Sequence, residues 1–197
     1  MFIRPLNTIG REGQHYMIDI TVENIVAHAQ IADNIDIKEI AEKLPEAIYN
    51  PEEFSGLTYK IEVPKTAILL LQNGKAICTG LKNIKDVEIA IKKFVNRLEE
   101  VNIELKEDID VEIKNIVVSA ELKKELHLSS ISKALLLENV DYEPTNFPGL
   151  IYRVEDIGAT LLIFSSGKIV CTGTNDVEEA TNAIDMMKEK LSSIGAL

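Results

Sequence analysis

The sequence predicts a protein of the α+β class that contains one unit twice, each copy an antiparallel sheet with helices on one side. The first observation is a repeat: residues 49–80 align with residues 142–173 without a gap, and 13 of these 32 positions are identical. The second is an earlier match between Asn24-Ile25-Val26 and Asn115-Ile116-Val117. The third is the shared order of patterns: strand, helix, three strands joined by tight turns, helix. A unit duplicated once indicates a pseudo-twofold molecule, which suits a pseudo-twofold partner.

The first copy contains, in order, an expected strand at 22–32, a helix at 36–44, strands at 56–62, 67–71 and 76–79, and a helix at 86–101. The first helix is expected because Ile37, Ile40 and Leu44 follow helical spacing. Asp36 suits its N-cap, with Glu39 at the capping-box position. Asn73-Gly74 between two apolar runs predicts a hairpin.

The second copy repeats this order with a strand at 109–122, a helix at 129–137, three strands between 150 and 172, and a helix at 176–194. The repeats are therefore expected at residues 21–104 and 105–197. Residues 1–20 lack the apolar run of a signal peptide and are interpreted as an N-terminal extension.

The composition limits the class of protein. A chain of 197 residues with 46% hydrophobic content can bury a core as one domain or as two fused halves. The longest apolar run, Ala67–Leu71, is too short to cross a bilayer, so no membrane partner is expected. Two cysteines, Cys78 and Cys171, make no disulfide framework and favour a reducing cytosol. The net charge of −11 still permits a local basic face.

The sequence also offers little for catalysis. It contains no recognisable nucleophile–base pair, metal-ligand set or phosphate-binding loop. The three histidines do not have the spacing of metal ligands. The glycines of the hairpins do not precede helices, so they do not form a phosphate-binding loop. The protein is therefore expected not to be an enzyme and to need no cofactor.

The predicted sheet has two apolar faces, although helices on one side can cover only one. Leu69 and Leu71 share one face of their strand, while Ile68 and Leu70 share the other. An exposed apolar sheet face usually marks a binding site. The alternative is that a second sheet or a homodimer buries it.

Polar residues on the second face favour a DNA minor groove as the partner. That groove offers hydrogen-bond acceptors at A·T pairs, so short neutral donors and apolar contacts suit its floor. Cations suit the phosphates along its edges. The paired polar residues are Asn24 and Asn115, Thr79 and Thr172, and, towards the margins, Lys60 and Arg153, and Lys75 and Lys168.

The strings YEPTNFPGLIYR and LLIFSSGKIVCTG, together with the paired Asn-Ile-Val segments, resemble the TATA-box-binding protein family over residues 20–195. The acidity and the absence of a strongly basic second helix resemble an archaeal member. The resemblance implies a saddle: a curved ten-stranded antiparallel sheet with four helices on its convex side. It also implies that the concave face binds the TATA-box minor groove and bends the DNA by inserting phenylalanines.

Site residues follow from the resemblance position by position. The asparagines match amides that bond to bases, the valines an apolar floor, the threonines paired hydroxyls, the phenylalanines wedges, and the basic residues contacts to the DNA backbone. The implied DNA-binding residues are Asn24, Val26, Phe54, Lys60, Leu69, Leu71, Lys75, Thr79, Asn115, Val117, Phe147, Arg153, Leu162, Phe164, Lys168 and Thr172.

The resemblance further implies partners and a place in the cell. Glu143 resembles a contact for transcription factor B, which would connect the protein indirectly to RNA polymerase. Double-stranded promoter DNA is the principal partner, a homodimer is conceivable off DNA, and the location would be the cytoplasmic archaeal nucleoid.

The chain departs from the family pattern at a few positions. Leu71 stands where a second wedge phenylalanine of the first repeat is expected, and Glu23 and Lys114 stand where paired glutamines are usual. Because a carboxylate near a groove wall is repelled by phosphate, the first half-site is expected to bind DNA less well than the second. The alternative function is a divergent paralogue that acts as a protein-interaction or regulatory module with weak DNA binding.

Overall fold

The computed structural model describes residues 2–3, 19–135 and 139–197. Most of the predicted N-terminal extension, and the last residues of the helix predicted at 129–137, lie outside the described residues. The strands are β1 (Phe2–Ile3), β2 (Ile20–Gln30), β3 (Ile48–Tyr49), β4 (Leu57–Glu62), β5 (Lys65–Leu70), β6 (Lys75–Leu81), β7 (Asp108–Ile109), β8 (Val111–Glu121), β9 (Val140–Asp141), β10 (Leu150–Val154), β11 (Ala159–Ile163) and β12 (Lys168–Thr174). The helices are α1 (Ile37–Lys43), α2 (Ile84–Glu100), α3 (Leu128–Leu135) and α4 (Val177–Ser193), with a 3₁₀ turn at Glu155–Ile157.

The strand order confirms the predicted α+β fold. Ten strands form an antiparallel sheet in the order β3-β4-β5-β6-β2-β8-β12-β11-β10-β9, and β1 pairs in parallel with β7. The described residues also contain the four α helices that the resemblance implied.

The chain divides into two compact units, whose boundaries cut through two strands. Among the described residues, unit 1 comprises 2–3 and 24–114, and unit 2 comprises 19–23, 115–135 and 139–197. The start of β2, up to Glu23, therefore belongs to unit 2, whereas the start of β8, up to Lys114, belongs to unit 1. The repeats at 21–104 and 105–197 stay a prediction about the sequence.

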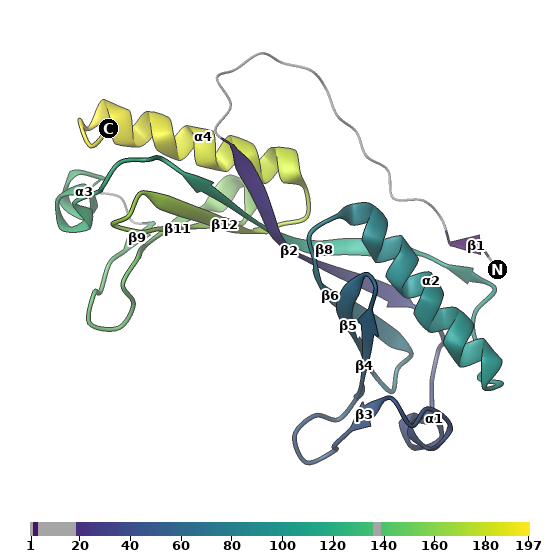
Figure 1. Ribbon diagram of the computed structural model, residues 1–197. Coiled ribbons are helices and arrows are strands. Elements are labelled where there is room, and N and C mark those ends of the chain that lie inside the picture. The colour runs from purple at the N-terminus through teal and green to yellow at the C-terminus, as the bar shows by residue number, and fades with distance from the viewer. Residues whose placement is uncertain (1, 4–18, 136–138) are drawn as a thin grey trace. The chain divides into compact units, whose positions relative to one another are not determined.

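Within each unit a long helix lies along one face of the strands (Figure 1). In unit 1, α2 lies against β5 and β6, and in unit 2, α4 lies against β11 and β12. Phe94 of α2 is fully buried, which stabilises the fold by about 2 kcal/mol. Its ring lies 5.1 Å from that of Tyr59, so this tyrosine belongs to the helix side.

Local chemistry sets the ends of the helices. Asp36 caps α1 as predicted, and its carboxylate accepts hydrogen bonds from the backbone N–H groups of Lys38 and Glu39. Helix α2 begins two residues earlier than predicted, because the side chain of Asn83 accepts from the Lys85 N–H. The predicted hairpin at Asn73-Gly74 joins β5 to β6.

Alternation along the strands separates a covered face from an open face. In β2, Ile25, Ala27 and Ala29 are buried, whereas the intervening Asn24, Val26 and His28 are only half-buried. Cys78 and Cys171 are buried on the helix side, as expected for small core residues. The open faces carry the predicted site.

Candidate functional site

In each unit the open face contains a row of cross-strand neighbours. In unit 1 the row runs Thr58, Leu69, Ile77, His28 across β4, β5, β6 and β2. In unit 2 the equivalent row runs Ile151, Leu162, Val170, Ser119. The predicted floor residues Val26, Leu69, Val117 and Leu162 are half-buried rather than sealed in a core. Each unit therefore presents apolar side chains on the face opposite its helices.

The predicted asparagine and threonine of each unit form one polar group on this face. In unit 2 the Thr172 hydroxyl lies 3.1 Å from the amide nitrogen of Asn115 and 3.2 Å from its amide oxygen. In unit 1 the Asn24 amide nitrogen lies 3.3 Å from the Thr79 hydroxyl. All four side chains are half-buried and reachable from the open face.

Two glycines that sequence reasoning did not assign orient these amides. The N–H of Gly173 donates to the amide oxygen of Asn115 at 2.8 Å, and Gly80 does the same for Asn24 at 2.8 Å. Both glycines have positive φ, +97° and +100°, at irregularities in strand register. Each amide oxygen therefore accepts a backbone hydrogen bond. The NH₂ group has two hydrogens, so it keeps one for an external acceptor after donating the other to the threonine hydroxyl. The repeated Cys-Thr-Gly string was the signal that could have identified them.

The predicted wedge residues differ between the units. In unit 2 the rings of Phe147 and Phe164 stack edge to face, 5.8 Å apart, and both are half-buried. A Cβ on Gly149 would meet both rings, so the glycine leaves room for the pair. In unit 1 the ring of Phe54 lies over Gly56 in the same way, while Leu71 stands where Phe164 stands in unit 2. Only unit 2 therefore has an aromatic pair at this position.

The predicted cations lie at the margins of the open faces. Lys60 and Arg153 are exposed at the ends of cross-strand rows that include Thr79 and Thr172 respectively. Lys75 and Lys168 are half-buried at the start of β6 and β12.

Glu23, which was expected to affect the first half-site, contacts two residues of unit 2. Its carboxylate accepts a hydrogen bond from the Ser119 hydroxyl at 2.7 Å and lies 3.8 Å from the Lys168 ammonium. The effect of Glu23 on the first half-site stays a prediction, while both of these contacts lie in unit 2. The reason is that β2 continues past the boundary between the units, so its first residues lie beside β8 and β12 of unit 2.

The counterpart of Glu23 in the repeat is Lys114, and it belongs to unit 1. Lys114 forms an ion pair with Glu112 at 2.5 Å. Burial, followed by the positive charges of Lys75 and Lys114, lowers the pKa of His28 below its ordinary value near 6.5. Glu112 opposes that effect on His28, and its own pKa is lowered, chiefly by its hydrogen bond with Lys114. Unit 1 therefore groups His28, Lys75 and the Lys114–Glu112 ion pair, where the equivalent positions of unit 2 hold Ser119, Lys168 and Glu23.

Glu143, the predicted protein contact, is exposed in the loop that carries Phe147. Its backbone carbonyl accepts from the N–H groups of Asn146 and Phe147, and its carboxylate accepts from the Asn146 amide at 2.6 Å. A charged side chain thus lies beside the wedge residue and faces solvent.

The buried thiols are not arranged as reactive groups. Burial raises the pKa of Cys171 to about 11, and burial also raises the pKa of Cys78. Throughout the described ranges, no three His, Cys, Asp or Glu residues gather in a way that could hold a metal ion. Among the helices of those same residues, none has the length and apolarity needed to span a bilayer.

Comparisons with known proteins agree with this geometry. The family model described as "Transcription factor TFIID (or TATA-binding protein, TBP)" matches residues 19–101 and 110–194. The TATA-box-binding protein of Thermoplasma volcanium is 46% identical over 178 residues, covering 90% of this chain and 97% of the relative. That of Methanothermobacter thermautotrophicus is 44% identical over 177 residues, covering 90% and 97%. The solved structure of Methanococcus jannaschii TBP has a TM-score of 0.77 at 41% identity and covers 91% of this chain and 99% of that one.

Proposed function

Because the chain belongs to the TATA-binding protein family, we propose that it is a transcription initiation factor that binds and bends TATA-box promoter DNA through the minor groove. In this proposal it is not an enzyme and works without a cofactor. It acts on chromosomal DNA in the cytoplasm, at the archaeal nucleoid.

The observation that carries the proposal is the repeated amide on an apolar open face. Asn24 and Asn115 each have an amide oxygen fixed by a glycine N–H, which leaves an N–H donor for the groove floor. The minor groove at A·T pairs offers acceptors but no donor, so this arrangement fits A·T and disfavours G·C, whose exocyclic amine projects into the groove. The apolar rows of Leu69 and Leu162 fit the sugar walls beside those bases.

Bending is supported by the aromatic pair of unit 2. Minor-groove proteins kink DNA by inserting apolar side chains between base steps. Phe147 and Phe164 lie together at the margin of the open face, where such insertion is possible without rebuilding the core. In unit 1, Phe54 corresponds to Phe147 and Leu71 corresponds to Phe164. A leucine side chain can also insert between base steps.

Recruitment of transcription factor B is the finer part of the proposal. Glu143 is exposed beside Phe147, so a basic partner could contact it while DNA occupies the open face. RNA polymerase would then be recruited indirectly. The exposed apolar faces would favour a homodimer in the absence of DNA.

A gel-shift titration tests the proposed function. The full chain is titrated with a TATA-box duplex and with a duplex in which the A·T pairs of the box are replaced by G·C pairs. A shift that requires the A·T box at moderate salt is expected. Equal affinity for both duplexes would overturn the proposal.

Two observations favour the second candidate, a paralogue that binds proteins and has only weak affinity for DNA. Leu71 replaces an aromatic wedge, and Glu23 places a carboxylate beside Lys168. The same titration separates the two functions, because this candidate shows no preference for the TATA duplex.

A further inference from the structure

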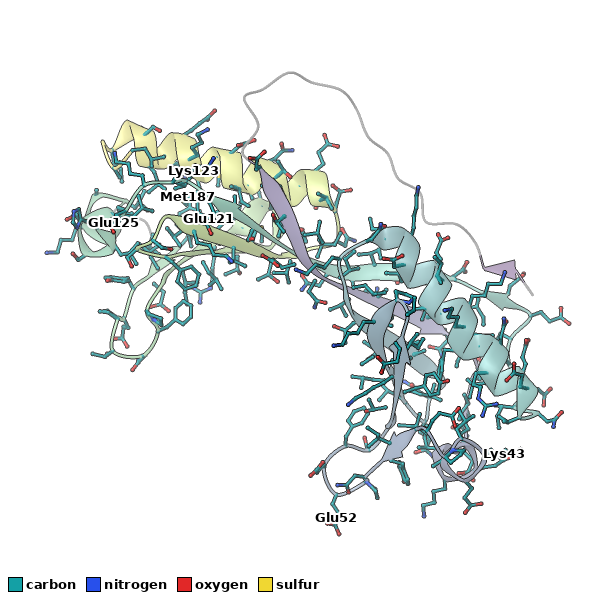
Figure 2. The ribbon with its side chains drawn as sticks, in the orientation of Figure 1. Lys43, Glu52, Glu121, Lys123, Glu125 and Met187 are labelled. Atoms are coloured by element: carbon teal, nitrogen blue, oxygen red, sulfur yellow. The ribbon has the colours of Figure 1, made fainter. Side chains whose placement is uncertain are left out.

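Two equivalent lysines of the open faces have different electrostatic surroundings. Lys75 begins β6 in unit 1, and Lys168 begins β12 in unit 2. The cross-strand neighbour of Lys75 is Gln30, whose amide donates to the backbone carbonyls of Ala32 and Asn73. The cross-strand neighbour of Lys168 is Glu121, labelled in Figure 2. A neutral residue in unit 1 thus corresponds to a carboxylate in unit 2.

A second carboxylate approaches Lys168 from β2. The Glu23 carboxylate lies 3.8 Å from the Lys168 ammonium, a distance at which opposite charges attract appreciably near a protein surface. The Ser119 hydroxyl holds this carboxylate in place with a charge-assisted hydrogen bond of 2.7 Å. Within the described part of the chain, no carboxylate lies within 4.0 Å of the Lys75 ammonium. Its more distant charged surroundings contain both Lys114 and Glu112, which pair with each other at 2.5 Å.

We propose that Glu23, supported by Glu121, is a built-in counter-ion that competes with DNA phosphate for Lys168, so that unit 1 supplies more of the salt-dependent phosphate binding than unit 2. The inference rests on the proposed function and deepens it by assigning a different role in DNA binding to each unit. Unit 1 neutralises phosphates chiefly through Lys75, which has no carboxylate within 4.0 Å in the described residues, and unit 2, with its aromatic pair, distorts the DNA.

The physical reason is the exchange of counter-ions. A cation that binds phosphate releases about 0.9 of a condensed ion from the DNA, and each such contact adds that amount to the slope of log affinity against log salt. Lys168 must first give up part of its attraction to Glu23, and the carboxylate then remains near the phosphates. The side chains of Lys168 and Glu23 are 40% and 33% exposed, so phosphate can reach both.

A double-mutant cycle tests the competition. Affinity for a TATA duplex is measured at several salt concentrations for the wild type, Lys168→Gln, Glu23→Gln and the double variant, with Lys75→Gln as the matched reference. We expect Lys75→Gln to weaken binding by about threefold to fivefold and to reduce the salt slope by about 0.9. Lys168→Gln should have a distinctly smaller effect on both. Glu23→Gln should tighten binding, and in that background Lys168→Gln should behave like Lys75→Gln.

The outcomes separate this inference from the function on which it rests. If the wild type prefers the TATA duplex but Lys168→Gln and Lys75→Gln have equal effects with Glu23 present, the counter-ion role is wrong and the function stands. Weaker binding by Glu23→Gln would also overturn it. If the wild type shows no preference for the TATA duplex, the proposed function and the counter-ion role of Glu23 are both wrong. Glu121→Gln provides a second variant. Like Glu23→Gln, it should make the dependence of affinity on salt steeper, because it frees Lys168 for phosphate. Thermal unfolding checks that each variant is folded.

Discussion

The amide oxygen of Asn115 accepts a hydrogen bond of 2.8 Å from the backbone N–H of Gly173. This contact fixes which end of the amide faces the backbone, so the NH₂ group is directed away from it. Thr172 lies 3.1 Å from that nitrogen and can take one of its hydrogens. The same arrangement recurs between Asn24, Gly80 and Thr79. Each unit therefore presents an N–H donor on its open face, which the proposed function assigns to the floor of the groove.

Replacing this amide should reduce both stability and DNA affinity. Asn115→Ala removes the acceptor for the Gly173 N–H and the donor for a base, so we expect a loss of about 1 kcal/mol in the free energy of unfolding. Urea denaturation measures the first effect and a TATA-duplex titration the second. Thr172→Val is a comparison for the stability effect alone, because it keeps the hydrogen bond from the Gly173 N–H to Asn115 while removing the hydroxyl that is itself a predicted DNA contact. A variant that lost stability but kept full affinity for the duplex would contradict the role of Asn115 at the groove floor.

The two wedge positions should contribute unequally to DNA bending. Phe164 is paired with Phe147 at 5.8 Å, whereas Leu71 offers a smaller side chain at the equivalent position. We expect Phe164→Ala to reduce the bend angle more than Leu71→Ala, because it removes a larger inserted group and half of the aromatic pair. Energy transfer between dyes at the ends of a TATA duplex measures the angle. Equal reductions would show that the units bend DNA equally.

Protonation of His28 should have opposite effects on folding and on DNA binding. Burial, Lys75 and Lys114 lower its folded pKa below the ordinary value, with Glu112 acting in the other direction. The unfolded chain therefore takes up the proton more readily, so the stabilising contribution is present above about pH 6.5 and is lost as pH falls. Protonated His28 also adds a cation beside Lys75, which should tighten binding to phosphate.

The measurement compares wild type with His28→Gln between about pH 7.5 and about pH 5.5. Relative to the variant, the wild type should lose stability in chemical denaturation and gain affinity for the TATA duplex as the pH is lowered. His28→Gln serves as the control because it keeps a polar side chain of similar size without the titrating group. Identical pH profiles for both proteins would refute the prediction.

The hairpin glycine should tolerate no side chain. Gly74 has φ of +73°, and a Cβ there would collide with the carbonyl oxygen of Ala32. We expect Gly74→Ala to cost about 3 kcal/mol, since it combines backbone strain with displacement of the neighbouring chain. Gly158 has a similar φ of +67° but open space around it, so Gly158→Ala should cost only about 1 kcal/mol. Both variants introduce backbone strain, but only Gly74→Ala adds a collision, so the difference between their losses in thermal unfolding measures the collision. Equal losses would mean that the contact at Ala32 is unimportant.

Much of the fold could be predicted because it depends on short-range patterns. The duplication is visible as identical residues at a constant offset, and Asp36 and Asn73-Gly74 specify a cap and a turn through their own chemistry. Alternation with a period of two places Asn115 and Val117 on the face opposite Ile116 and Val118, whatever the rest of the chain does. These residues determine an open, partly apolar face by themselves.

Cross-strand pairing is what the sequence left undecided. The family resemblance linked Glu23 to the first half-site, yet β2 extends into unit 2 and brings this carboxylate to Ser119 and Lys168. The irregular register at Gly80 and Gly173 that brings their N–H groups to the asparagines was likewise not predicted. The sequence thus determined which side chains share a face, because alternation is local. Only the tertiary structure decided which charges face one another, because strand register depends on contacts between residues far apart in the chain.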